Sequence, residues 1–122
     1  AGSQDTTLSL ILDGRLRVMA GEDANIFTTL CMGGAGAIAA SAHVRTGRFV
    51  ALYRALAAGR LDEGRAIWHS LAPLVRAMFD EPNPGPVKSA LAAQGVIADG
   101  LRAPMTRASA ALQQRLRELV AV

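Results

Sequence analysis

The feature that most constrains this chain lies between residues 16 and 41, where two short apolar segments flank one helix-like stretch. The first segment, Leu16 to Ala20, is followed by Gly21-Glu22-Asp23, and the second, Gly36 to Ala40, consists of small residues and one isoleucine. This order predicts a strand, a crossover helix and a second, parallel strand. Ligands of α/β folds lie beyond the carboxyl ends of parallel strands. We therefore expect the chemistry at residues 21–23 and 38–41.

Two helices are predicted around the first strand. Asp5 or Thr6 is a suitable N-cap for a short helix that ends at Asp13-Gly14. Asp23 is a suitable cap for the crossover helix, which Gly33-Gly34 ends.

From Arg45 onward the spacing of apolar residues predicts helices alone. Four are expected, bounded by glycine or proline, at about residues 45–58, 61–79, 86–94 and from 104 onward. Pro86 and Pro104 suit first helical positions, where a missing N–H costs nothing. Pro73 lies inside the second of these helices and is expected to bend it, because proline lacks a backbone donor.

The charge pattern argues against several classes of partner. The formal net charge is +3, but the arginines are scattered and only 4% of residues are aromatic, so we expect no nucleic-acid binding. No apolar run has the length that a bilayer requires, so we expect no membrane partner. Cys31 is the single cysteine, which excludes an intrachain disulfide and a thiolate-rich metal site and suits a cytoplasmic location.

Two strands are too few for an independent parallel sheet. Parallel sheets are buried on both faces and normally have more strands. We therefore expect this chain to be part of a larger protein.

Five motifs occur in an order and spacing typical of one known family. They are Gly-Ser-Gln-Asp at 2–5, Met-Ala-Gly-Glu-Asp-Ala at 19–24, Gly-Gly-Ala-Gly-Ala-Ile at 33–38, Leu-Tyr-Arg-Ala-Leu at 52–56 and Glu-Pro-Asn-Pro-Gly-Pro-Val-Lys at 81–88. The chain resembles the C-terminal part of the dihydrodipicolinate synthase and N-acetylneuraminate lyase family. The resemblance implies an α/β fold: residues 1–58 supply the last two strands and their helices of a (β/α)8 TIM barrel, and residues 59–122 form a C-terminal helical appendage.

The same resemblance implies class I aldolase chemistry. The family's Schiff-base lysine is expected immediately before Ala1, so no catalytic residue lies in the chain itself. Pyruvate and a small aldehyde are the implied substrates, with no cofactor, no metal, and assembly as a dimer of dimers. Gly21 matches the glycine whose backbone carbonyl faces the second substrate, and Ile38 matches a residue that lines the pyruvate pocket. From the residues alone, a turn glycine of positive φ and a barrel-packing isoleucine explain these positions equally well.

Other polar residues receive structural interpretations. Glu22-Asp23 can be read as a carboxylate pair for acid–base work, but a helix cap is the better reading of Asp23. His43 is expected to be a turn or packing residue, and His69 a surface residue. Lys88, the single lysine, lies in the family's Pro-Val-Lys motif, whose role is structural.

Departures from the family patterns bear on the activity. Gly21-Glu22-Asp23-Ala24 is closer to the synthases' Gly-Asp-Asp-Ala than to the lyases' Gly-Tyr-Asp-Glu, which favours condensation of pyruvate with aspartate semialdehyde. However, Ala39 and His43 stand where the synthases have serine and asparagine. An aldolase or dehydratase of another 2-keto acid therefore remains an alternative, as does a non-catalytic helical interaction module.

Overall fold

A computed structural model describes residues 3–121, which form two compact units. The first unit comprises residues 3–39 and 47–70, and the second comprises residues 40–46 and 71–121. Ala1, beside which the lysine is expected, lies outside the described residues. No helix in the described part of the chain is long and apolar enough to cross a membrane.

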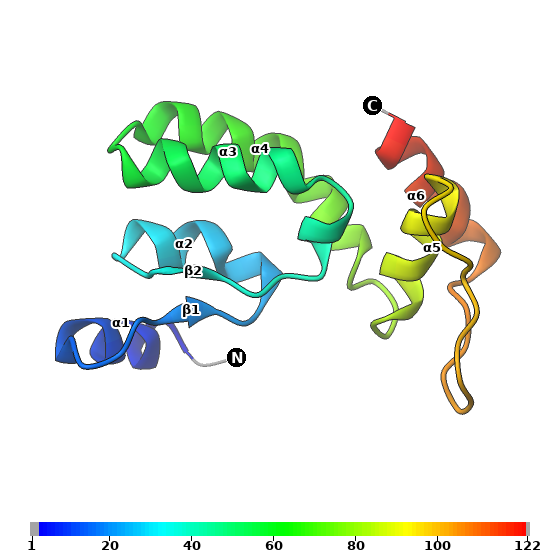
Figure 1. Cartoon of the computed structure of the whole chain (residues 1–122), viewed down its shortest axis with the longest axis horizontal. Coiled ribbons are helices and arrows are strands. Elements are labelled where there is room, and N and C mark those ends of the chain that lie inside the picture. Colours follow the sequence, from blue (N-terminus) through cyan, green and yellow to red (C-terminus); the bar gives the residue numbers. More distant parts are fainter. Residues whose placement is uncertain (1–2, 122) are drawn as a thin grey trace. The chain divides into compact units, whose positions relative to one another are not determined.

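Helix α1 (Gln4–Asp13) opens the first unit (Figure 1). Its N-cap is Ser3, whose Oγ accepts the Thr6 N–H at 3.1 Å, so the prediction of Asp5 or Thr6 as the cap was wrong. Gly14, with φ of 72°, ends the helix as expected. The serine hydroxyl takes the capping position because it can reach an N–H three residues along.

Strands β1 (Met19–Ala20) and β2 (Gly36–Ala37) pair in parallel, with Met19 opposite Gly36 and Ala20 opposite Ala37. The 3-10 turn η1 (Asp23–Asn25) and helix α2 (Ile26–Cys31) connect them, and α2 lies against both strands. Both strands are shorter than predicted. Each strand pairs with only one other strand in the described chain, so few of its backbone groups form inter-strand hydrogen bonds.

Helices α3 (Thr46–Ala57) and α4 (Leu61–Ala77) follow. They approach closely in the first unit, because a β-carbon added to Gly64 would lie 2.5 Å from Leu56 Cδ2. Helix α4 continues through Pro73 to its end, and the predicted bend stays a prediction. The rings of Phe27 and Trp68 stack with centroids 6.2 Å apart, which packs α2 against α4.

The second unit contains the short turn η2 (Ser41–His43), helix α5 (Gly85–Ala93) and helix α6 (Ala110–Ala121). Its apolar core draws on α5, α6, the end of α4 and residues next to η2, α4 and α6: Val44, Leu74, Ala77, Met78, Val87, Ala90, Ala108, Leu112 and Leu116. The close packing of α5 on α6 is part of this core.

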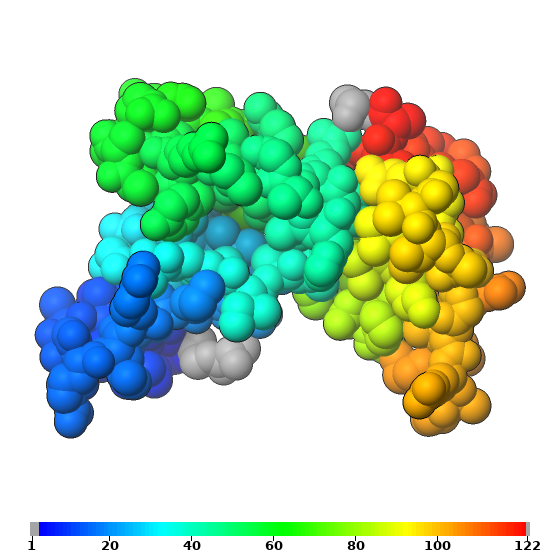
Figure 2. All heavy atoms as spheres, in the orientation of Figure 1, coloured from blue at the N-terminus to red at the C-terminus, as the bar shows by residue number. Residues whose placement is uncertain are grey.

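The last helix begins later than predicted. Pro104 lies in the loop between α5 and α6, whose gold and orange spheres project in Figure 2. Helix α6 starts after Ser109 instead, because the Ser109 Oγ accepts the Leu112 N–H at 3.2 Å. A polar cap outweighs the preference of proline for a first turn here.

Candidate functional site

Gly21 and Ile38 come directly after the paired residues of β1 and β2. The Ile38 N–H donates to the Ala20 carbonyl at 2.9 Å, and the Ala35 N–H donates to the Val18 carbonyl at 2.7 Å. These two hydrogen bonds extend the β-ladder beyond the residue pairs Met19–Gly36 and Ala20–Ala37, one at each end. The structure therefore brings both predicted residues to the carboxyl end of the two-stranded sheet, where α/β folds bind ligands.

Gly21 is an exposed residue with an ordinary backbone conformation. Its φ is not in the left-handed region, so the interpretation as a turn glycine of positive φ was wrong. A β-carbon added at Gly21 would meet no heavy atom within 4 Å. Neither backbone strain nor local packing in the described chain requires glycine here, which leaves room at this strand end for another molecule.

Ile38 is 75% exposed at the end of β2. An apolar side chain in this position is available either to a ligand or to further protein. Substrate binding by Gly21 and Ile38 stays a prediction, as does the barrel-packing alternative for Ile38.

A hollow of about 230 Å³ lies beside β1, between that strand and α1. Gly21 and Glu22 line it from the strand end, and Thr6 and Thr7 line it from α1. Ile38 does not line it. The wall carries hydroxyl, amide and carboxylate groups, and it contains no lysine, histidine or cysteine among the described residues. It can hold a polar molecule, but its lining includes no lysine amine that could form a Schiff base with a carbonyl carbon.

The two carboxylates at the strand end lie in different surroundings. Asp23 is 2% exposed and is the first residue of η1, while Glu22 is exposed, with its carboxylate 3.5 Å from Asn25 Nδ2. The N-cap positions of η1 and α2 belong to Glu22 and Asn25, so the expected capping position of Asp23 was wrong. Because Asp23 is buried and Glu22 is exposed, the two carboxylates do not form a solvated acid–base pair.

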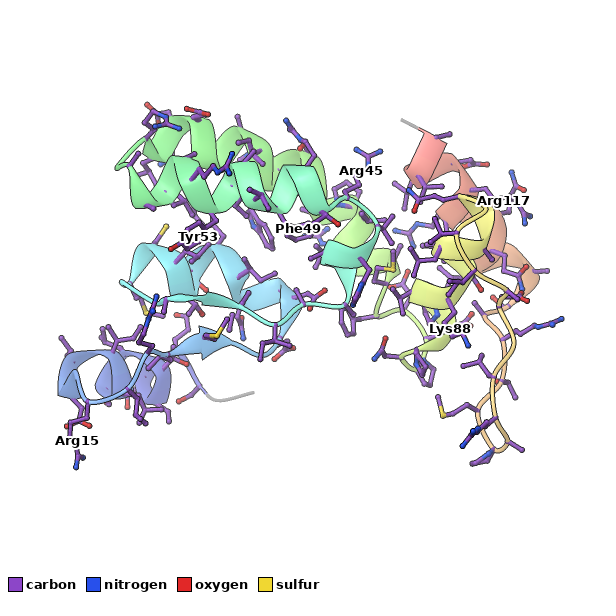
Figure 3. The ribbon with its side chains drawn as sticks, in the orientation of Figure 1. Arg15, Arg45, Phe49, Tyr53, Lys88 and Arg117 are labelled. Atoms are coloured by element: carbon purple, nitrogen blue, oxygen red, sulfur yellow. The ribbon has the colours of Figure 1, made fainter. Side chains whose placement is uncertain are left out.

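The remaining candidates are not among the residues that line the hollow. His43 is an exposed residue of η2, and His69 is exposed on α4, as predicted. Lys88 lies in α5, where its Nζ donates to the Gly100 carbonyl, a structural role (Figure 3).

Partial burial raises the pKa of the Cys31 thiol, against the opposing effect of Arg65. The thiol is therefore protonated at neutral pH and is a weak nucleophile. Among residues 3–121 no cluster of three histidine, cysteine or carboxylate side chains is arranged to hold a metal ion.

The sequence did not indicate that threonines line the hollow. Thr6, Thr7 and Thr29 come from two helices and meet Gly21 only because α1 and α2 pack beside β1. No local pattern signals this, since hydroxyl residues are common at helix starts and on helix surfaces.

Comparison with known proteins gives consistent matches. A model of the dihydrodipicolinate synthetase family matches residues 3–122. The chain is 39% identical over 108 residues to 4-hydroxy-tetrahydrodipicolinate synthase from Methanoculleus marisnigri, covering 88% of this chain and 37% of that protein. It is 43% identical over 104 residues to the protein of the same name from Halorhodospira halophila, covering 85% and 35%.

Solved structures agree with these matches. Dihydrodipicolinate synthase from Thermotoga maritima superposes with a TM-score of 0.90 at 36% identity, covering 96% of this chain and 40% of the other. The enzyme from Aquifex aeolicus gives a TM-score of 0.93 at 26% identity, covering 99% and 42%. The chain thus spans about two fifths of the length of the proteins it matches.

Proposed function

The chain belongs to the dihydrodipicolinate synthetase family, with the fold of the C-terminal part of a TIM barrel, and on this premise we propose that it forms part of a 4-hydroxy-tetrahydrodipicolinate synthase. The complete enzyme would condense pyruvate with aspartate semialdehyde. The observation that carries this proposal is the identity of 33–43% to relatives of that name over 85–98% of this chain. Residues 1–58 would close the barrel, and residues 59–122 would form the helical appendage.

The proposed reaction uses a lysine outside the chain, expected immediately before Ala1. Its amine attacks the keto carbon of pyruvate, water leaves, and the resulting iminium accepts the electron pair when a methyl proton departs. The nucleophilic carbon so formed then attacks the aldehyde carbon of the second substrate. No cofactor or metal is required, because the iminium itself is the electron sink.

The residues of this chain would form one wall of the site. Gly21 would present its backbone carbonyl to the second substrate, and its open surroundings support that role. Ile38 would contact pyruvate with its exposed apolar side chain. Both roles follow from the family resemblance and are supported by the position of the two residues at adjoining strand ends.

Reduction with borohydride tests the chemistry. The full-length protein is incubated with pyruvate and borohydride, digested, and searched by mass spectrometry for a lysine that carries reduced pyruvate. We expect the adduct on the peptide that contains the residue immediately before Ala1, and none when pyruvate is omitted. Absence of an adduct would remove the whole mechanism.

A second activity in the same family is favoured by Ala39 and His43, which replace the serine and asparagine typical of the synthases. Such an enzyme would form the same pyruvate adduct but accept a different aldehyde. Initial rates with aspartate semialdehyde and with other small aldehydes separate the two activities. We expect aspartate semialdehyde to be the better substrate.

We also propose a homo-oligomer, a dimer of dimers, in the cytoplasm. The family resemblance supports the assembly, and a single cysteine suits a reducing compartment. Sedimentation velocity of the full-length protein measures the assembly, and a purely monomeric species would contradict it.

A further inference from the structure

Strand β2 has no large side chain that could fix its own pairing with β1. Ala35, Gly36 and Ala37 lie between the turn that ends α2 and Ile38 at the strand end. Strands of such small residues specify their register weakly, and a slip by one residue would place a different residue at the strand end. The register that brings Ile38 to this position is therefore determined by groups outside β2.

The first such group lies at the end of α2, next to the turn that leads into β2 (Figure 1). Thr29 is 2% exposed, and its carbonyl accepts the Gly34 N–H at 2.8 Å. The three heavy atoms nearest to a β-carbon added to Gly34, apart from its chain neighbours, all belong to Thr29, and Cγ2 would lie only 2.5 Å away. The Thr29 methyl group thus occupies the space that a side chain at residue 34 would need.

This contact opposes a slip of the chain in either direction. A slip one way would put the methyl group of Ala35 against Thr29, in the place of Gly34. A slip the other way would put Met32 in the left-handed conformation of Gly33, whose φ is 97°. Residues with a β-carbon rarely adopt that conformation. The turn therefore favours a single register at the start of β2.

A second contact lies within the ladder. Met19 of β1 is paired with Gly36, and a β-carbon added to Gly36 would lie 3.2 Å from Met19 Cε. That distance is shorter than an ordinary contact between carbon atoms. A slip by one residue would bring Ala35 or Ala37 opposite Met19, where the methyl group would crowd Cε. The methionine therefore favours glycine as its partner.

We propose that Thr29 and Met19 are positioning residues that set the register of β2 on β1 and thereby place Ile38 at the strand end next to that of Gly21. Both act through glycines, and all of these residues belong to the first unit. The effect on pyruvate binding rests on the proposed function, because it assumes that Ile38 faces pyruvate. The effect on the register does not, since it concerns the packing of α2, β1 and β2 alone.

Amide hydrogen exchange of the full-length protein tests the register. The Ala35 and Ile38 N–H groups donate to β1, so peptides covering residues 34–39 report whether the observed pairing persists. Thr29→Ser deletes only the Cγ2 methyl group, and we expect exchange in these peptides to become about threefold to tenfold faster. Thr29→Val retains a methyl group there and should keep exchange within about twofold of wild type. Equal acceleration in the two variants would overturn the proposal.

Thr28→Ser is the matched control, because it deletes the same methyl group one residue earlier on α2. Thr28 Oγ1 donates to the Asn25 carbonyl at 3.1 Å, and serine can make the same bond. We expect exchange over residues 34–39 to be unchanged in this control. Met19→Ala removes the contact with Gly36 and should accelerate exchange as Thr29→Ser does. If either variant exchanges at the rate of the control, the inference is wrong.

Kinetics test the consequence at the site. With pyruvate varied, we expect Thr29→Ser and Met19→Ala to raise KM about threefold to tenfold and to change kcat by less than about twofold, because a displaced Ile38 would weaken pyruvate binding. Thr29→Val and Thr28→Ser should change neither constant. Faster exchange with an unchanged KM would overturn the positioning role. A wild-type enzyme that forms no reduced pyruvate adduct would contradict the proposed function instead, and the exchange experiment would still decide what sets the register.

Discussion

Gly21 is a glycine whose surroundings in the described chain would accommodate a side chain. The backbone conformation is an ordinary one, and an added β-carbon would meet nothing within 4 Å. The residue can therefore be changed without a folding penalty, which makes it a clean test of substrate binding. Gly47, in the first turn of α3, is a matched control because its β-carbon would also meet nothing within 4 Å.

We predict that Gly21→Ala leaves the free energy of unfolding within about 0.5 kcal/mol of wild type. It should lower kcat/KM for aspartate semialdehyde about tenfold, because one misplaced methyl group in a binding site costs about 1–3 kcal/mol. Denaturant titration and initial rates of the full-length protein measure the two effects. A loss of activity no greater than in Gly47→Ala would show that Gly21 does not face substrate.

Gly34 is constrained by its neighbour in the turn that ends α2. A β-carbon there would lie 2.5 Å from Thr29 Cγ2 and 2.7 Å from the Thr29 carbonyl oxygen. The carbonyl is backbone and accepts the Gly34 N–H at 2.8 Å, so it cannot move without loss of that bond.

Gly34→Ala is therefore expected to reduce the free energy of unfolding by about 1–3 kcal/mol, the usual cost of overpacking. Urea denaturation of the full-length protein checks this, with Gly47→Ala again as the control. A stability equal to that of the control would mean that the turn relaxes freely.

At the scale of elements, the start of α6 depends on a carboxylate from another part of the second unit. Glu81 Oε2 accepts the Ser109 N–H at 2.8 Å, just ahead of the first residue of the helix. Hydrogen bonds from the Ser109 side chain and then from its backbone N–H lower the pKa of Glu81 below its ordinary value of 4.5. The ionised carboxylate is thus the form that supports the helix start.

A lowered pKa in the folded protein gives stability that is present above the unfolded-state value and is lost as pH falls through the folded-state value. We predict that Glu81→Gln, which can still accept the Ser109 N–H but cannot titrate, makes stability less dependent on pH below about 4.5. Thermal unfolding at a series of acidic pH values measures this. Parallel curves for variant and wild type would contradict the role of Glu81.

The types and approximate places of the elements were largely predictable from sequence. Gly14 and Gly33-Gly34 end helices as predicted, because turn glycines act within a few residues of themselves. The errors concern competition between nearby polar groups. Ser3 caps α1 in place of Asp5, and Ser109 starts α6 well after Pro104. Which candidate caps a helix depends on how the preceding chain approaches, and short patterns do not encode that.

At the scale of the whole molecule, large apolar side chains remain uncovered in the described chain. Leu12 is 76% exposed, Leu16 67% and Ile38 75%. Exposed apolar surface of this kind normally packs against further protein.

We predict that the 122-residue chain expressed alone binds a hydrophobic dye strongly and unfolds without a cooperative transition, while the full-length protein binds little dye and unfolds cooperatively. Dye fluorescence and calorimetry of the two proteins make the comparison. Cooperative unfolding of the short chain without dye binding would instead favour the non-catalytic helical module.

The sequence by itself determined the helix-rich pattern, the pair of parallel strands and the family, because periodicity, turn glycines and motifs are properties of neighbouring residues. Only the tertiary structure decided that Asp23 is buried, that threonines of α1 face the same hollow as Gly21, and that Gln94 and Arg45 donate to the Val44 and Leu119 carbonyls. These two hydrogen bonds join residues 50 and 74 positions apart. Such bonds arise from how helices pack around a shared core, and no local pattern specifies that packing.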